Sequence, residues 1–163
     1  MRISASLQGE FENEMSNTRK ILERVPQNSD WKPHEKSMSL GRLSAHVAEL
    51  PSWVTMTMST EELDWATFGY KPFEAENNAA LLQFFDRNVE DAKTTIQNGT
   101  DEAFLHNWTM RNGDKVYFTM PKIAVIRSFA MNHLIHHRAQ LTVYLRLLNV
   151  PLPMLYGPTA DEQ

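Results

Sequence analysis

The chain has 163 residues without cysteine, of which 42% are hydrophobic and 22% charged, and its formal net charge is −4. This composition indicates one globular domain over residues 1–163, and the negative charge offers no field that would attract nucleic acid or an anionic membrane. The absence of cysteine excludes disulfides and any thiolate ligand or nucleophile from the chain itself. Because no apolar run nears the ~20 residues that span a bilayer and the opening residues lack the apolar core of a signal peptide, we expect a cytoplasmic protein.

Four segments place their apolar residues at steps of three and four, which is typical of one buried helix face. They cover residues 11–25, 43–53, 82–96 and 126–148. No strand-rich region competes with them. The pattern therefore predicts an all-α fold, a four-helix bundle.

Breaks in the first half of the chain mark the ends of these helices. Pro26 ends the first helix, and residues 27–36 form a long polar connection. Pro51 falls inside the second apolar pattern, so that this helix kinks or stops nearby. Residues 59–62, Ser-Thr-Glu-Glu, resemble a capping box that opens a short helix through Trp65.

In the second half, Asn98-Gly99 indicates the stop of the third helix. Apolar residues at 108–110 and 116–119 then flank Asn112-Gly113, and Asn-Gly is a strong signal of a β-hairpin turn. We therefore expect a small two-stranded hairpin before the last helix, whose first turn suits Pro121.

Three of the six histidines, His46, His133 and His137, fall on stripes that otherwise carry core residues. His133 and His137 are one helical turn apart, so their rings lie on one face, about 6 Å apart along the axis. Imidazole is costly on an inner face unless its nitrogens are satisfied, and two rings at this spacing can converge on one cation. The alternative is that each is a core histidine satisfied by hydrogen bonds.

Three imidazoles with an open fourth position are typical of a catalytic divalent site. The open position could hold a water, whose pKa the ion lowers to about 7, or a substrate atom. Zinc and nickel are the expected ions, although imidazole also suits copper and iron.

The other histidines are weaker candidates. His136 is the competitor to His133 and His137 as a ligand, and we expect it to flank the site because it points about 100° around the helix from His137. His34 and His106 lie in or beside loops, where a surface role is expected.

Three further residues could act at such a site. Glu49 could orient His46 or serve as a general base, but a solvated glutamate is the expected role. Arg138 could meet an anionic substrate, whereas a structural salt bridge is the expected role. Tyr144 is expected to pack in the core. No catalytic residue is identified.

Three blocks of sequence then match one known family in order. They are the run from Asn132 to Leu148, which contains NHLIHHRAQL; residues 31–50, with WKPHEKSMSL and LSAHVAEL; and the tail over residues 150–162. Together they resemble the DinB/YfiT-like superfamily, and the resemblance covers nearly the whole chain.

The resemblance implies an up-down-down-up four-helix bundle that is often a homodimer. It also implies a divalent metal ion held by one histidine of the second helix and two of the fourth, which are His46, His133 and His137 in this chain. Ala139 stands where the family often has glycine, on another helix face from the ligands.

Function is less transferable than fold. Some relatives use the metal to activate a low-molecular-weight thiol and transfer its sulfur to an electrophile, which makes a thiol-dependent S-transferase the first hypothesis. A metal-dependent hydrolase fits the same ligands. A non-enzymatic, metal-binding or stress-related dimer is the alternative from another class, and a scaffold with no metal is a third. The expected partners are a small-molecule substrate, with a thiol as one candidate, and a second copy of the chain.

Overall fold

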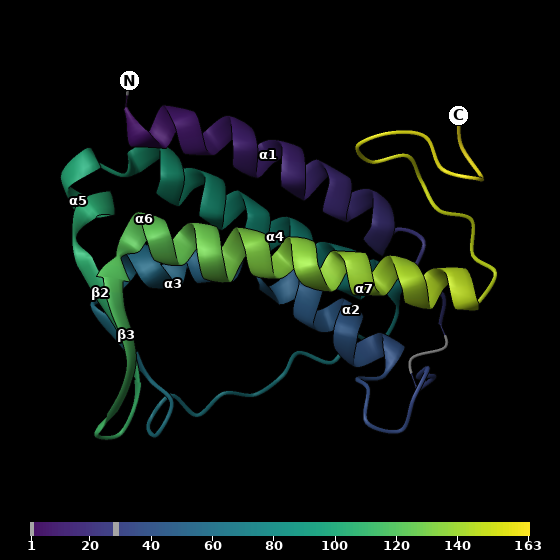
Figure 1. The fold of residues 1–163 in the computed structure, drawn as a ribbon, viewed down its shortest axis with the longest axis horizontal. Coiled ribbons are helices and arrows are strands. Elements are labelled where there is room, and N and C mark those ends of the chain that lie inside the picture. The colour runs from purple at the N-terminus through teal and green to yellow at the C-terminus, as the bar shows by residue number, and fades with distance from the viewer. Residues whose placement is uncertain (1, 28–29) are drawn as a thin grey trace.

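The computed structural model describes residues 2–27 and 30–163, and it is mostly helical with a small three-stranded sheet (Figure 1). The helices are α1 (Ile3–Leu22), α2 (Leu40–Glu49), α3 (Ser52–Ser59), α4 (Asn78–Asn98), α5 (Asp101–Leu105), α6 (Lys122–Val125), the π-helical η1 (Ile126–Asn132) and α7 (His133–Leu147). The strands are β1 (Glu62–Asp64), β2 (Asn107–Asn112) and β3 (Lys115–Pro121).

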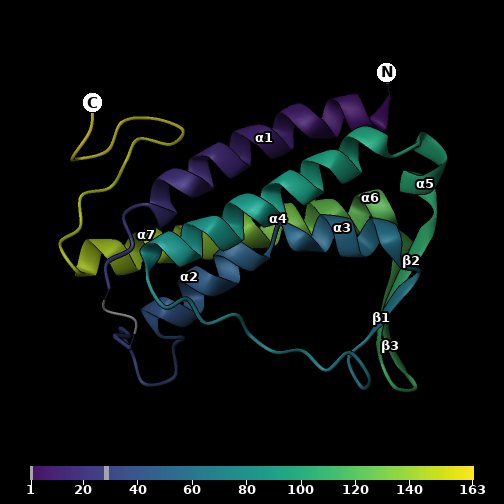
Figure 2. The same cartoon turned by 180° about the vertical axis from the view of Figure 1, so that it is seen from behind.

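Four long helical segments lie side by side: α1, α2 with α3, α4, and the run from α6 through η1 to α7 (Figures 1 and 2). In both views α1 and α7 run in one direction, and α2–α3 and α4 run in the other. Their inner faces share one apolar core, in which Phe11, Leu43, Phe85 and Leu141 are at most 1% exposed. Burial of each such side chain contributes about 1.5–3 kcal/mol.

The predicted helix breaks near Pro51 and Gly99 are confirmed. Helix α2 ends at Glu49 and α3 begins at Ser52, because Pro51 has no N–H to continue the ladder. Helix α4 ends at Asn98, and Gly99 follows it in an extended conformation. Helix α1 ends at Leu22, before Pro26.

The predicted hairpin is also confirmed, since β2 and β3 pair antiparallel around a turn at Gly113, whose φ is +57°. The short helix expected from the capping box is wrong, because Glu62–Asp64 form strand β1, parallel to β2. The Thr60 hydroxyl bonds the carbonyl of Met56 at the end of α3 (2.8 Å) and accepts from Trp108 Nε1 (2.9 Å), so it caps no new helix.

The last helical segment departs from a single α-helix. Its first turn, α6, is followed by the seven-residue π-helical stretch η1 before α7 begins at His133. No Pro or Gly lies within η1, and none of the sequence patterns predicted it. Such π-helical stretches occur frequently at functional sites, and this one sits directly before two of the candidate ligands.

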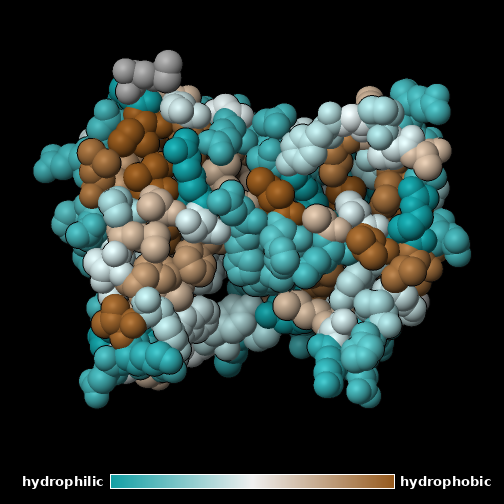
Figure 3. All heavy atoms as spheres, viewed as in Figure 1, coloured by the Kyte–Doolittle hydropathy of each residue, from teal (hydrophilic) through white to brown (hydrophobic). Residues whose placement is uncertain are grey.

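The outer surface is mixed in character. On the face over α7, hydrophilic side chains cross the middle of the molecule, with hydrophobic patches toward both ends (Figure 3). No helix in residues 2–27 and 30–163 has the length and apolarity needed to cross a membrane.

Candidate metal centre

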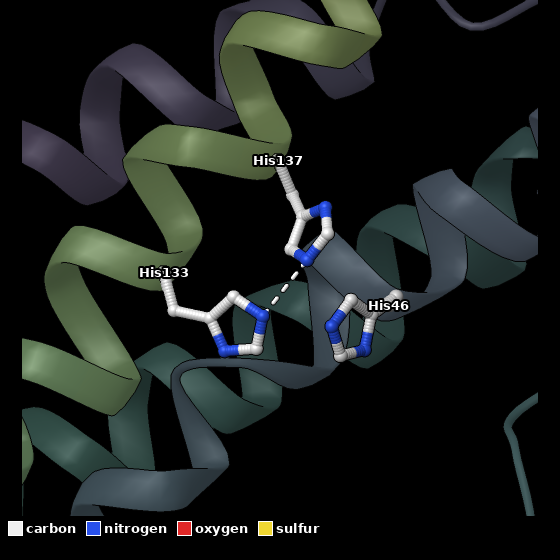
Figure 4. Close-up of side chains that lie close together, drawn as sticks. All are labelled: His46, His133 and His137. Carbon is white, nitrogen blue, oxygen red and sulfur yellow. Dashed lines mark hydrogen bonds between the residues drawn. The ribbon is translucent and has the colours of Figure 1, made fainter.

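His46 of α2 faces His133 and His137 of α7, and the three rings gather between these helices (Figure 4). The ring centroid of His46 lies 5.2 Å from that of His133 and 4.8 Å from that of His137. The centroids of His133 and His137 are 4.6 Å apart. One nitrogen from each ring lies within 4.8 Å of the other two. The structure thus brings together the three histidines that the helical stripes singled out.

The secondary structure explains how the rings meet. His133 and His137 project from one face of α7 because they are four residues apart. Leu134 and Leu141 are fully buried on the same helix and anchor it to the core. Helix α2 packs against α7, and this contact carries His46 to the pair. All three rings are partly shielded from solvent, and His137 is 9% exposed.

A hydrogen bond defines the proton position on the ring of His137. Nδ1 of His137 lies 2.7 Å from Oε1 of Gln140, while Nε2 of the same amide lies 3.1 Å from His136 Nε2. Because the amide nitrogen donates to His136, its oxygen accepts, so Nδ1 of His137 carries the proton. The carbonyl of Phe129 accepts a hydrogen bond from the ring of His133.

The bond at Nδ1 leaves Nε2 of His137 with its lone pair, and this atom lies 2.8 Å from Nε2 of His133 (Figure 4). Two lone pairs at this distance repel unless a cation or a proton lies between them. Burial, and then the charges of His137 and His46, lowers the pKa of His133 to about 4. Burial also lowers the pKa of His137, although the hydrogen bond that this ring donates to Gln140 acts to raise it. Both rings are therefore neutral at pH 7, which is the form that binds metal.

The donor set fits a divalent ion. Tetrahedral zinc ligands at ~2.0–2.1 Å from the ion lie roughly 3.3 Å from one another, and the donor atoms of His46, His133 and His137 lie within 4.8 Å of one another. Three neutral imidazoles leave the full charge of the ion at the site and a fourth position open. Nickel, copper and iron also accept imidazole ligands.

Glu49 lies on the Nδ1 side of the His46 ring. Its Oε2 lies 3.7 Å from Nδ1 of His46, which is longer than a hydrogen bond, and this buried nitrogen has no hydrogen-bond partner within the described residues. The hydroxyl of Tyr70 donates to the same carboxylate oxygen at 2.6 Å. Burial alone would raise the pKa of Glu49, but His46, Tyr70 and Arg42 together lower it.

The expectation of a solvated Glu49 is therefore wrong. Its side chain is 15% exposed and lies beside the ring of His46, 3.7 Å from Nδ1. Packing of the loop that carries Tyr70 against α2 withdraws Glu49 from water, and periodicity along α2 carries no information about that loop.

Two other candidates in α7, His136 and Arg138, lie outside the ligand set. His136 is exposed and flanks the site, held by Gln140, as expected. Arg138 is 2% exposed and pairs with the carboxylate of Glu14 at 2.6 Å, which confirms the structural salt bridge.

The remaining candidates are also accounted for. Tyr144 packs edge-on against Trp31 at 5.6 Å. His34 is exposed, and His106 pairs with Glu61 on the surface at 2.9 Å. None of these residues reaches the three-histidine cluster.

Four residues around the site were not predicted: Gln140, Tyr70, Arg42 and Phe129. Gln140 and Arg42 could have been found from helical spacing, because each lies within one turn of a ligand on the same helix. Tyr70 belongs to an irregular loop and Phe129 to the π-helical stretch, and neither segment has a sequence signal that places it.

Comparisons with known proteins agree with this fold. The model of the DinB family matches residues 4–163. A DinB-like protein from Bacillus subtilis, YjoA, superposes with a TM-score of 0.70 at 20% identity, covering 94% of this chain and 99% of its own. A DinB-like protein from Bacillus cereus ATCC 10987 gives a TM-score of 0.69 at 19% identity, with coverage of 95% and 98%. A search of curated proteins found no match.

Proposed function

The chain belongs to the DinB family, and from that premise we propose that it is a metal-dependent enzyme with a divalent ion, zinc or nickel, held by His46, His133 and His137. The observation that carries the proposal is the convergence of three imidazoles, whose donor atoms lie within 4.8 Å of one another, with Nε2 of His133 and Nε2 of His137 2.8 Å apart. A cation at this point would take the ring nitrogens as ligands.

We propose a low-molecular-weight thiol as the reactant at the open position. An ion held by His46, His133 and His137 would lower the pKa of such a thiol and so would supply a thiolate nucleophile at neutral pH. The sulfur must come from outside because the chain has no cysteine.

The arrangement of carboxylates favours this thiol over water, the nucleophile of the alternative hydrolase. A hydrolytic site commonly adds a general base within reach of the attacking water. Within the described residues, no Asp or Glu joins the cluster of His46, His133 and His137. Glu49 lies on the Nδ1 side of His46 and acts as a positioning residue. A thiol needs no such base once the ion has lowered its pKa.

The protein's own groups hold the ligand rings in place. Gln140 accepts a hydrogen bond from Nδ1 of His137, which leaves Nε2 of that ring free toward the site, and the carbonyl of Phe129 bonds the ring of His133. Glu49 and Tyr70 favour the matching orientation of His46.

The finer features of the assembly are also proposals. We assign the helices to the up-down-down-up bundle of the family, and the molecule to a cytoplasmic homodimer, since low-molecular-weight thiols stay reduced in that compartment. Val143 and Leu147 support a dimer, because they are 57% and 56% exposed, one turn apart near the end of α7.

Elemental analysis of untagged protein, paired with a thiol-consumption assay, tests the proposal. We expect about one divalent ion per chain and turnover of a thiol with a model electrophile. Both are lost in His46→Ala and His137→Ala, and both are kept in the control His34→Ala. Metal without thiol turnover would favour a non-enzymatic role, and wild-type protein with no bound metal would overturn the proposal.

A further inference from the structure

Arg42 lies beside the candidate metal centre with part of its guanidinium unused. It precedes His46 by one turn on α2, so both side chains leave the same face of the helix. Nη2 donates to the hydroxyl of Tyr70 at 3.1 Å. Nη1 is buried and has no acceptor within residues 2–27 and 30–163. A buried donor without an acceptor is costly, and a guanidinium fork is matched by a carboxylate.

A wall of aromatic rings lies at the opposite end of the three-histidine cluster. Phe129 precedes His133 by four residues, and its ring meets that of His133 edge-on at 6.4 Å. It stacks with Trp53 at 6.2 Å and with Phe118 at 4.9 Å. These aromatic rings are half-buried, so part of their surface remains open to a ligand. The surface favours an apolar or aromatic group.

The direction of the helices sets the order of these groups. Along α2 and α3 the chain passes Arg42, His46 and then Trp53, whereas toward α7 it passes Phe129 and then His137. Because these segments run in opposite directions (Figures 1 and 2), Arg42 lies toward the His137 end and Trp53 toward the Phe129 end. The histidine cluster therefore separates a cationic end from an aromatic end.

The segment after β1 connects these two ends. Trp65 packs against Trp53 at 6.2 Å, and its ring centroid lies 6.1 Å from that of Tyr70. The guanidinium carbon of Arg42 lies 5.9 Å from the Tyr70 ring. These contacts form a continuous line of side chains from Trp53 to Arg42.

From this arrangement we propose that the site binds a small carboxylate with an apolar or aromatic body, whose carboxylate pairs with Arg42 and whose body packs on Phe129 and Trp53. The inference rests on the proposed function, in which the reacting atom of the bound molecule lies at the three histidines. Arg42 and the aromatic wall are the specificity-determining groups.

A cavity on another side of Arg42 suits an anion poorly. This cavity of about 500 Å³ lies among the ends of α1, α2 and α4, and none of the three histidines lines it. Asp30, Glu74 and Glu76 contribute to its walls, and their negative charge repels a carboxylate. The proposed carboxylate therefore lies on the histidine side of Arg42.

Calorimetric titration with phenylalkanoates of one to four methylenes tests the proposal, with 3-phenylpropan-1-ol as the neutral analogue of 3-phenylpropanoate. We expect the best carboxylate to bind at least about tenfold more tightly than its alcohol, because a charged hydrogen-bonded pair is worth a factor of this order. Arg42→Gln loses that advantage and keeps its metal content. The control Arg87→Gln, on the exposed side of α4, changes neither quantity.

Other variants separate this proposal from that of the metal. Tyr70→Phe keeps Arg42 and is expected to bind the carboxylate, which serves as the test if Arg42→Gln does not fold. Phe129→Ala is expected to weaken the binding of the carboxylate and of the alcohol by the same factor. If wild-type protein as isolated holds no metal and still binds the carboxylate through Arg42, the proposed metal function is refuted and the carboxylate proposal stands.

Three results overturn the inference. The first is equal affinity of wild-type protein and Arg42→Gln for the carboxylate, together with its loss in His46→Ala, which would put the carboxylate on the metal. The second is equal affinity of wild-type protein for the acid and the alcohol. The third is the absence of saturable binding across the whole phenylalkanoate series.

Discussion

Replacement of Arg138 by Met tests the buried ion pair that ties α7 to α1. Arg138 donates to the carboxylate of Glu14 at 2.6 Å, to the Glu14 carbonyl at 3.0 Å and to the Thr18 hydroxyl at 3.0 Å. It also donates to the hydroxyl of Tyr156. Removal of one partner of a buried pair leaves the other charge uncompensated, which costs about 3–5 kcal/mol.

The cost lies near the lower end of this range because Glu14 keeps a bond from Tyr156 at 2.5 Å. We expect Arg138→Met to lower the free energy of unfolding by about 3 kcal/mol. For a chain of this size, the corresponding fall in Tm is about 6–12 °C. Thermal unfolding followed by circular dichroism measures it, in the presence of a chelator so that metal binding does not contribute.

A double-mutant cycle and a surface pair supply the controls. The variant with both Arg138→Met and Glu14→Leu carries no buried charge, so it is expected to be more stable than Arg138→Met alone by about 2 kcal/mol. Arg127→Met breaks the exposed pair with Glu10 at 3.2 Å and costs at most about 1 kcal/mol. A strictly additive cycle, or equal costs for Arg138→Met and Arg127→Met, would refute the reasoning.

Further predictions concern the metal, protons and two glycines. Chelation is expected to lower the Tm of wild-type protein, because a metal at 1,000 times its Kd contributes about 4 kcal/mol to the free energy of unfolding. The Tm of His46→Ala is expected to stay unchanged, and equal changes in the two proteins would contradict the metal site. In metal-free protein the pKa of His133 is about 4 when folded, against its ordinary value of 6.5, so the unfolded chain protonates first as pH falls. Stability is therefore constant above about pH 6.5 and declines toward pH 4, by about 1–2 kcal/mol for a half-exposed ring; denaturant titrations should find a smaller decline in His133→Asn. Gly9→Ala in α1 meets no atom within 4 Å, whereas a Cβ at Gly99 would lie 2.6 Å from the Phe104 ring. Urea unfolding should show the first stabilised by about 0.5–1 kcal/mol and the second destabilised by about 1–3 kcal/mol, and the reverse order would count against this packing.

The local pattern of the chain determined the helices and half of the candidate site. Apolar steps of three and four select one helix face, and a separation of four residues puts His133 and His137 on the same side of α7 without reference to any other segment. The hairpin around Gly113 is equally local, because Asn-Gly supplies the turn that joins β2 and β3.

Packing between distant segments decided the rest. The strand at Glu62–Asp64 forms because β2 offers it a partner, although its residues are suited to a helix start. Glu49 is withdrawn from water because Tyr70 packs against it, and Nη1 of Arg42 is buried without an acceptor among the described residues. His46 joins its two partners only through the contact of α2 with α7. Neighbours along a helix are fixed by the geometry of its own backbone, whereas such contacts depend on how all the faces of the molecule pack together.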